Sequence, residues 1–92
     1  MKNVITVYKT QSCQMCRATT RKLDKAGAEY TEVFVDAPEN AELANAIRVR
    51  ADELGVVSQA PYVTVYNDEN QLVDDWFGFR PDKITTATEA AA

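Results

Sequence analysis

The feature that most constrains this chain is a pair of cysteines, Cys13 and Cys16, at the junction of a predicted strand and a predicted helix. Residues 4–8 are all β-branched or aromatic, which predicts a strand. Residues 13–26 have a helical pattern, with Ser12 as the expected N-cap. The cysteines therefore lie in the first turn of a helix that follows a strand.

The remaining residues predict three more strands and two more helices. Gly27 stands where glycine commonly ends a helix. Asp36 and Glu39 have the spacing of a capping box, before a helix whose apolar residues recur until Gly55. Four polar residues, 67–70, predict the turn of a hairpin. The expected strands are 30–35, 62–66 and 72–77, and the expected helices follow Asp36 and Pro81.

The order of these elements is βαβαββα, which indicates an α/β fold with a four-stranded mixed sheet flanked by three helices. The first unit implies two parallel strands joined by a right-handed crossover, and the hairpin adds two antiparallel strands. The chain of 92 residues shows no internal repeat or linker. We therefore expect one domain over residues 1–92, with a frayed tail from about residue 88.

The charges are divided unevenly along the chain. Ten Lys and Arg against fourteen Asp and Glu give a net charge of −4, which argues against a nucleic-acid partner. Residues 1–30 carry six bases and two acids, whereas the remaining residues carry four bases and twelve acids. The basic part surrounds the cysteines, where positive potential favours a thiolate. A solvated helix face is the other explanation for the same residues.

Targeting signals and composition point to a reducing compartment. The apolar run of residues 4–8 is too short for a signal peptide, and no stretch reaches the ~20 apolar residues that cross a membrane. We therefore expect a cytoplasmic protein without membrane contact, where a close cysteine pair is more often redox-active or metal-binding than structural. The chain has no histidine, which excludes an imidazole base and a Cys₂His₂ zinc site.

A Cys-x-x-Cys pair at this position favours dithiol chemistry for three reasons. Free backbone N–H groups and the dipole at a helix N-terminus stabilise an anion. Positions i and i+3 on a helix bring two Cα atoms to about 5 Å, within the span of a disulfide. Cys13 lies at the helix tip and Cys16 is shielded, so Cys13 is the expected nucleophile and Cys16 the expected resolving cysteine.

Two other interpretations of the pair remain open. Half of a zinc site would need carboxylates or a second copy of the chain to complete it, which would make the protein a zinc-bridged interaction module. A purely structural bridge would close a small ring and constrain little. The strand–helix–strand setting favours the redox interpretation, with no metal site expected.

Two further segments make the sequence similar to a known family. Residues 54–61 (Leu-Gly-Val-Val-Ser-Gln-Ala-Pro) and 76–82 (Trp-Phe-Gly-Phe-Arg-Pro-Asp), together with the cysteine pair, closely resemble glutaredoxin-like redoxins of the NrdH type. The resemblance runs from residue 4 to about residue 84. It implies a thioredoxin-like fold and a thiol-disulfide oxidoreductase with no bound cofactor. It also implies a monomer that takes electrons from NADPH through thioredoxin reductase and passes them to class Ib ribonucleotide reductase.

The resemblance also assigns residues to the binding of substrates and partners. In this family the proline at Pro61 is cis and leaves the backbone of Ala60 free to pair with a bound polypeptide. Trp76 and Phe79 flank Gly78 in an apolar rim beside the dithiol, although core packing explains a tryptophan equally well. The remaining expected binding residues are Gln14 and Met15, between the cysteines, and Arg80, which either bonds loop carbonyls or is solvated.

The chain departs from the family pattern at several positions. The family has Lys and often Pro before the first cysteine, where this chain has Thr10 and Gln11. Lys9 or the basic helix then supplies any help that this lysine gives to the thiolate. A glutaredoxin proper has Pro-Tyr between the cysteines and a Gly-Gly turn for glutathione, and this chain has neither. A glutaredoxin dependent on glutathione or another low-molecular-weight thiol is the alternative hypothesis.

Overall fold

The computed structural model describes residues 3–90, and residues 1–2 and 91–92 lie outside the described part. Within residues 3–90 the chain forms four strands and three α-helices in the order that the sequence predicts, together with one short 3₁₀-helix that was not predicted. The strands are β1 (Val4–Lys9), β2 (Tyr30–Phe34), β3 (Tyr62–Tyr66) and β4 (Leu72–Phe77). The helices are α1 (Gln14–Lys25), the 3₁₀-helix η1 (Pro38–Asn40), α2 (Ala41–Leu54) and α3 (Pro81–Ala90).

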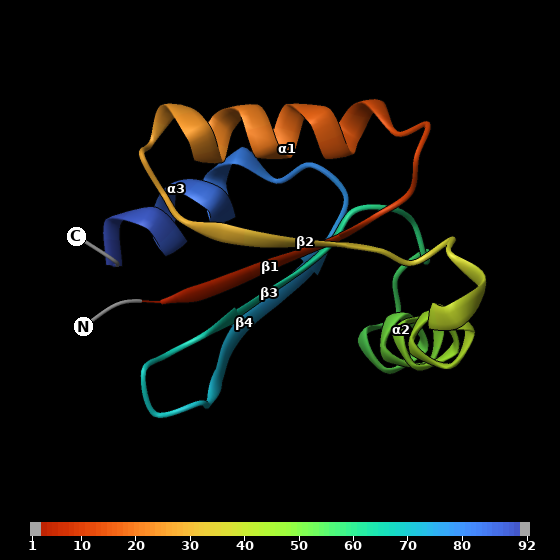
Figure 1. Ribbon diagram of the computed structural model, residues 1–92. Helices are drawn as coiled ribbons and strands as arrows, with labels where there is room; N and C mark the ends of the chain where they lie inside the picture. The colour runs from red at the N-terminus through yellow and green to blue at the C-terminus, as the bar shows by residue number, and fades with distance from the viewer. Residues whose placement is uncertain (1–2, 91–92) are drawn as a thin grey trace.

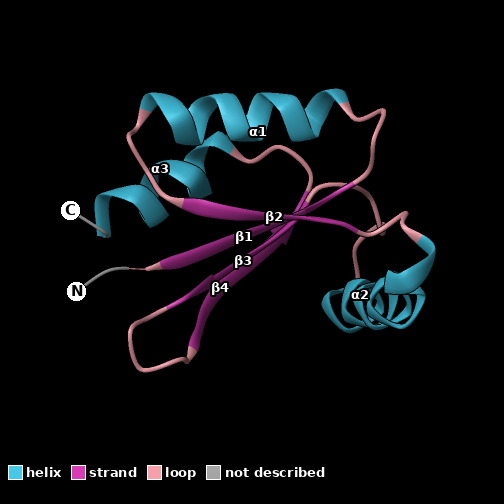
Figure 2. Ribbon diagram, in the orientation of Figure 1, coloured by secondary structure: helices cyan, strands magenta, loops and turns pink. Residues whose placement is uncertain are grey.

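The strands form one mixed sheet in the order β2-β1-β3-β4 (Figure 2). β1 pairs with β2 in parallel, as the crossover through α1 requires, and with β3 in the antiparallel direction. β3 and β4 form the predicted antiparallel hairpin, with an irregularity between Val65 and Tyr66. The structure thus confirms the expected four-stranded mixed sheet for the described residues.

Helices cover both faces of the sheet. α1 and α3 lie together on one face, and α2 lies on the other (Figure 1). The face beneath α1 and α3 holds the main apolar core, in which Val7, Val63 and Trp76 of the strands meet Leu23 of α1 and Ile84 of α3. Each fully buried aliphatic side chain contributes roughly 1.5–3 kcal/mol. This core therefore holds α1, which carries the cysteines, against the sheet.

Both ends of α1 have a local cause. The N-cap is Cys13, with extended backbone (φ −133°, ψ 107°), and not Ser12 as expected. Cys13 takes this position because its Sγ atom accepts a hydrogen bond from the backbone N–H of Cys16. At the other end Gly27 has φ +70° and donates its N–H to the carbonyl of Asp24. This is the glycine-dependent helix end that the sequence predicts.

The start of α2 differs from the expectation. Asp36 and Glu39 do not form a capping box, because η1 intervenes and α2 begins after Asn40, whose side chain makes no capping hydrogen bond. The Asp36 carboxylate accepts a hydrogen bond from the backbone N–H of Gln11 instead (3.1 Å). This bond joins the loop before the cysteines to the loop after β2.

α3 extends into the segment expected to be a frayed tail. Residues 88–90 are helical, and residues 91–92 of that tail lie outside the described part. Ala87 is 6% exposed and packs in the core, and the Thr88 hydroxyl donates to the Ile84 carbonyl. Among residues 3–90, no helix is both long and apolar enough to cross a membrane.

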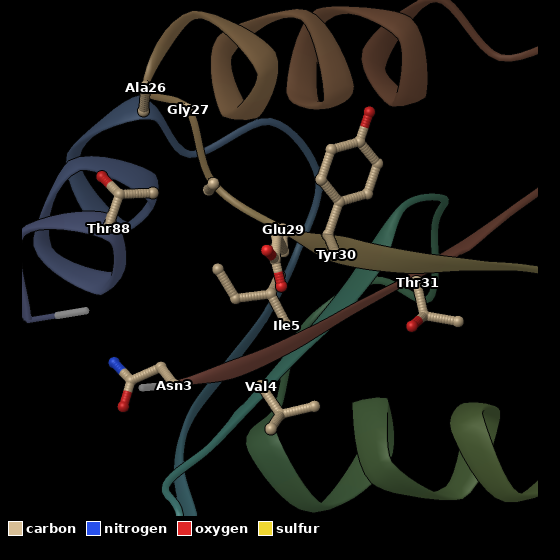
Figure 3. A pocket seen from close by; sticks show the side chains of 10 residues that line it. Asn3, Val4, Ile5, Ala26, Gly27, Glu29, Tyr30, Thr31 and Thr88 are labelled. Atoms are coloured by element: carbon tan, nitrogen blue, oxygen red, sulfur yellow. The ribbon is translucent and has the colours of Figure 1, made fainter. Parts of the chain in front are cut away.

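A hollow of about 450 Å³ lies at the end of the sheet where β1 begins (Figure 3). Asn3 and Ile5 of the β1 region, Glu29 before β2 and Thr88 of α3 contribute to its lining. The cysteines follow the opposite end of β1. The hollow is therefore separate from the candidate site.

We predict that Leu23→Ala lowers the free energy of unfolding by about 2–5 kcal/mol, because Leu23 is 1% exposed and its truncation leaves a cavity beneath α1. The matched control is Val49→Ala on α2. Val49 is 51% exposed, so its change is expected to stay within about 0.5 kcal/mol. Urea denaturation measures both effects, and equal losses would contradict the placement of Leu23 in the core.

Candidate active site

Three loops meet at one end of the sheet because of the strand register. Tyr8, near the end of β1, is paired with Tyr62 at the start of β3, and Tyr62 is paired with Phe77 at the end of β4. The loops that follow β1, precede β3 and follow β4 therefore leave the sheet at the same end (Figure 1). These loops lead to the cysteine pair, to Ala60 and Pro61, and to residues 78–80.

The two cysteines are joined by a disulfide. The Cα atoms of Cys13 and Cys16 lie 5.2 Å apart, in agreement with the distance expected from helical spacing. Cys13 is 9% exposed and Cys16 is 2% exposed. A partner therefore reaches Cys13 more easily, which supports the expected roles of Cys13 as nucleophile and Cys16 as resolving cysteine.

The N-terminus of α1 gives Cys13 an electropositive setting. Its Sγ atom accepts a hydrogen bond from the backbone N–H of Cys16 at 3.0 Å. Because Cys13 is the N-cap, the positive end of the helix dipole acts on the same sulfur. These interactions stabilise a thiolate at Cys13 once the disulfide is reduced.

The residues between the cysteines lie on the surface. Gln14 and Met15 are both exposed. Met15 extends toward the loop after β4, since a Cβ atom placed on Gly78 would lie 3.9 Å from the Met15 Sδ atom. The first turn of α1 and this loop are therefore neighbours.

The peptide bond between Ala60 and Pro61 is cis, as the resemblance implies. Pro61 is buried, and its carbonyl accepts a hydrogen bond from the backbone N–H of Gly78 (2.8 Å). Ala60 is partly exposed. The bond to Gly78 joins the loop before β3 to the loop after β4, so the two loops form one surface beside the cysteines.

Gln59 is a residue of this surface that the sequence reasoning did not single out. Gly78 has φ +87°, and a Cβ atom at this position would lie 2.9 Å from the Nε2 atom of Gln59. Glycine is therefore needed for its backbone conformation, and a larger residue would also displace the end of the Gln59 side chain. The available signal is the motif Gln59-Ala60-Pro61, which is among the residues that carry the resemblance.

Met15 and Phe79 supply exposed apolar surface at the site, whereas Trp76 does not. Trp76 is 4% exposed and packs in the core beneath α1 and α3, so the expectation that it forms part of an exposed rim is wrong. The cause is its position in β4, where it is paired with Val63 and shares the core face of the sheet. Phe79 is 37% exposed.

The basic side chains of Arg80 and Lys9 are both paired with acids. The Arg80 guanidinium donates two hydrogen bonds to the Asp82 carboxylate (3.2 and 3.0 Å), and its side chain is 48% exposed, in agreement with the expected solvated arrangement. Lys9 forms an ion pair with Glu32 and lies 4.8 Å from the centre of the Phe34 ring. Lys9 is therefore directed toward β2 and is not the replacement for the family's lysine.

An aromatic layer supports the site from the α2 face of the sheet. The ring centres of Tyr8 and Tyr62 lie 5.6 Å apart, and those of Tyr62 and Phe77 lie 4.5 Å apart. α2 packs against this layer through its buried residues. Tyr62 follows Pro61 and Phe77 precedes Gly78, so the layer holds the two loops in place.

Asp75 connects three elements within this layer. Its carboxylate accepts two hydrogen bonds from Arg50 of α2 (2.7 and 3.0 Å) and one from the Tyr62 hydroxyl (2.7 Å). The hydrogen bonds from Arg50 are the main reason that the pKa of Asp75 lies below its usual value. Burial, with the bond to Asp75, raises the pKa of Tyr62 above its usual range. The charged carboxylate thus fixes α2 to β3 and β4 at neutral pH.

The described residues offer no set of metal ligands. Within residues 3–90, no group of three or more His, Cys, Asp or Glu side chains is placed to hold a metal ion. The two cysteines are bonded to each other. A zinc site at this pair would therefore need ligands from outside the described part of the chain.

A family model and curated relatives match most of the chain. The Glutaredoxin family model matches residues 5–70, which include the cysteine pair and the Gln59-Ala60-Pro61 motif. The "Glutaredoxin-like protein NrdH" of Escherichia coli (strain K12) is 35% identical over 81 residues, which cover 87% of this chain and 83% of that protein. The protein of the same description from Shigella flexneri has the same identity and coverage.

Solved structures agree with this match. The NrdH-redoxin from Escherichia coli has a TM-score of 0.70 and 31% identity, and the alignment covers 90% of this chain and 92% of that one. Fasciola hepatica thioredoxin has a TM-score of 0.65 at 20% identity, with 99% and 82% coverage. The glutaredoxin of Archaeoglobus fulgidus has a TM-score of 0.64 at 18% identity, with 90% and 83% coverage. The fold is thioredoxin-like, as expected.

We predict that Gly78→Ala lowers the reduction of disulfide-bonded peptides about tenfold, because alanine is strained at φ +87° in the loop beside the cysteines and its methyl group also displaces the Gln59 amide. The matched control is Gly55→Ala. Gly55 has φ +70°, but nothing lies within 4 Å of an added Cβ atom, so this variant is expected to lose about 1 kcal/mol of stability and keep its activity. The measurement is the kcat/KM of each variant with the same peptide. Equal kcat/KM values for Gly78→Ala and Gly55→Ala would rule out the Gln59–Gly78 contact as a support of the site.

We predict that Asp75 makes folding acid-sensitive. Its pKa is lower in the folded chain than the ordinary 3.8, so its stabilisation is present above that value and is lost as the pH falls below it. Asp75→Asn is expected to lower the free energy of unfolding at neutral pH by about 1–3 kcal/mol, because Arg50 and Tyr62 lose a charged acceptor. On acidification, Asp75→Asn should then lose less of its free energy of unfolding than the wild type does.

The matched control for this prediction is Asp74→Asn. Asp74 is the preceding residue in β4 and pairs with Lys83 at the surface, with its side chain 35% exposed, so its loss is expected to cost no more than about 1 kcal/mol. Urea unfolding at neutral pH and at about pH 3 measures all three proteins. An undiminished acid sensitivity of Asp75→Asn would contradict the assignment.

Proposed function

The chain belongs to the glutaredoxin family, and we propose that it is a dithiol electron carrier of the NrdH type, reduced by thioredoxin reductase. It is a thiol-disulfide oxidoreductase whose redox-active pair is Cys13 and Cys16. The observation that carries the proposal is the position of this pair. It lies at the N-terminus of α1, beside the surface that Pro61 and Gly78 hold together.

In the reduced protein the Cys13 thiolate attacks one sulfur of a target disulfide. A bond forms between Cys13 Sγ and this sulfur, the target S–S bond breaks, and the other target sulfur leaves as a thiolate that takes up a proton. The Cys16 sulfur, after losing its proton, attacks Cys13 Sγ and releases the second target thiolate, which is also protonated. The target gains two electrons and two protons, and the carrier ends with the Cys13–Cys16 disulfide.

The surrounding residues favour both steps. The Cys16 N–H, which bonds Cys13 Sγ in the disulfide, stabilises the attacking thiolate in the same place. The partly exposed Ala60 offers its backbone to an extended target segment. Met15 and Phe79 offer exposed apolar side chains on the first turn of α1 and on the neighbouring loop after β4. These contacts hold a target disulfide against Cys13.

Thioredoxin reductase is proposed over glutathione as the electron donor for two reasons. Gln14 and Met15 replace the Pro-Tyr pair of glutaredoxins, and Phe79 follows Gly78 where a Gly-Gly turn would bind glutathione. The Escherichia coli relative, a glutaredoxin-like NrdH-redoxin, has a thioredoxin-like activity profile. NADPH then supplies the electrons through the reductase, and this chain needs no bound cofactor.

The proposed electron acceptor is class Ib ribonucleotide reductase, the partner that the NrdH resemblance implies. An enzyme that is left with a disulfide after turnover needs a dithiol donor, and the two steps above supply one. The same proposal places the protein in the cytoplasm, because NADPH-dependent thiol reduction belongs to a reducing compartment. It also takes the protein to act as a monomer.

We predict that the protein supports NADPH oxidation when thioredoxin reductase and a disulfide substrate are present. Cys13→Ser is expected to abolish this activity because the nucleophile is lost. Cys16→Ser is expected to stop after the first step and to accumulate mixed disulfides with the substrate, since no resolving thiol remains. NADPH absorbance measures turnover, and non-reducing electrophoresis with mass spectrometry identifies the mixed disulfides.

Ala46→Ser, at an exposed position of α2, is the control and is expected to keep full activity. Full turnover by Cys16→Ser would contradict the dithiol mechanism. Turnover with glutathione and none with thioredoxin reductase would favour the glutathione-dependent alternative. About half an equivalent of zinc per chain in the reduced protein would favour the zinc-bridged module.

A further inference from the structure

The exposed side of α1 carries a line of positive charge that begins beside the dithiol. Arg17, Arg21 and Lys25 are all exposed and stand four residues apart. Residues at this spacing lie one helical turn from the next on the same helix face. Arg17 directly follows Cys16. We call Arg17, Arg21 and Lys25 the basic stripe.

Among the ion pairs of the described residues, none neutralises the basic stripe. Within residues 3–90, no ion pair includes a residue of α1. The only acid of α1, Asp24, accepts a hydrogen bond from the Tyr30 hydroxyl (2.8 Å). The ion pairs of the described residues involve the bases Lys9, Arg50, Arg80 and Lys83. The three exposed positive charges of the stripe therefore have no ion-pair partner within the described part of the chain.

Helix stability does not account for the whole basic stripe. Lys25 stands in the last turn of α1, where a cation is favourable. Arg17 stands in the first turn, which contains no acidic residue, and a cation there faces the positive end of the helix dipole. A positive charge at that end is unfavourable for the helix, which indicates a use outside it.

We propose that the basic stripe is a docking surface for the acidic flank of a protein disulfide and guides such partners to Cys13. The proposal rests on the electron-carrier function above, because the partner must reach the dithiol. The stripe begins at Arg17, which directly follows Cys16, so a partner whose disulfide lies at Cys13 has the stripe within reach along the exposed side of α1. The chain as a whole carries a charge of −4, and an acidic partner is therefore repelled elsewhere and attracted along α1.

An acidic protein fits this surface better than a nucleic acid does. The basic stripe is a single row on one helix, whereas a nucleic acid tracks a broad basic face. The chain outside residues 1–30 carries twelve acids against four bases, which repels an extended polyanion. A compact acidic patch beside a disulfide matches both the position and the size of the stripe.

An effect of the same charges on the Cys13 thiolate has to be separated from docking. Arg21 is the better test residue, because it lies one turn farther from the cysteines than Arg17. A change in thiolate reactivity alters the reaction with every disulfide. A change in docking alters only the reaction with charged disulfides, and its effect decreases as salt screens the charges.

The test uses two disulfide-bonded peptides of equal length, one with acidic and one with basic residues beside the disulfide, and the neutral bis(2-hydroxyethyl) disulfide. The rate constants for reduction by the pre-reduced protein are measured at low and high salt. The wild type is expected to reduce the acidic peptide about tenfold faster than the basic one at low salt, with little difference at high salt. Arg21→Glu is expected to remove most of this preference and to leave the neutral reaction unchanged.

The matched control is the double variant Ala46→Glu/Val49→Glu on exposed positions of α2, which changes the net charge by the same amount. It is expected to keep most of the preference for the acidic peptide. Equal rates for the two peptides in the wild type would overturn the proposal. An equal loss of preference in the α2 variant, or a matching loss with the neutral disulfide in Arg21→Glu, would also overturn it.

An oligonucleotide-binding measurement and the reaction with the neutral disulfide separate two further outcomes. Binding of a single-stranded oligonucleotide that Arg21→Glu abolishes, without any peptide preference, would assign the basic stripe to nucleic acid and overturn the docking proposal. Failure of the wild type to reduce even the neutral disulfide would count against the electron-carrier function itself.

Discussion

The backbone pairing of β3 with both of its neighbours is the constraint on which the site depends. Because β3 lies between β1 and β4, the position of Tyr62 fixes where both flanking loops leave the sheet. The hydrogen bond between Gly78 and Pro61 continues this pairing beyond the strand ends. A slip of one residue would exchange the two faces of a strand and bring Phe77 to the face that Trp76 now occupies. Core packing on the two faces therefore determines the geometry beside the cysteines.

Much of this arrangement is readable from the sequence because it has local causes. Runs of β-branched and aromatic residues predict β1 and the hairpin, and Gly27 and Gly55 mark helix ends that require a left-handed backbone. Helical spacing predicts the separation of Cys13 and Cys16. The cis bond at Pro61 has a different origin, since only the family resemblance, and no local pattern, implied it.

The features that were missed depend on contacts between distant segments. Trp76 is adjacent to the site in sequence, but the pairing of β4 with β3 turns its side chain into the core. Asp36 has the right spacing for a capping box, yet its carboxylate bonds the loop before the cysteines. Gln59 matters because it lies against Gly78, a residue of another loop. Spacing along the chain predicts none of these three contacts.

The N-cap of α1 is also the reactive sulfur, and this has a thermodynamic consequence. In the oxidised protein the cap acceptor is a neutral disulfide sulfur, bonded by the Cys16 N–H. After reduction the acceptor is a thiolate, for which the same bond is charge-assisted and stronger. The cap therefore stabilises the reduced form more than the oxidised form, which makes the protein a stronger oxidant than an uncapped pair would be. The hydrogen bond that caps α1 therefore also raises the reduction potential of the cysteine pair.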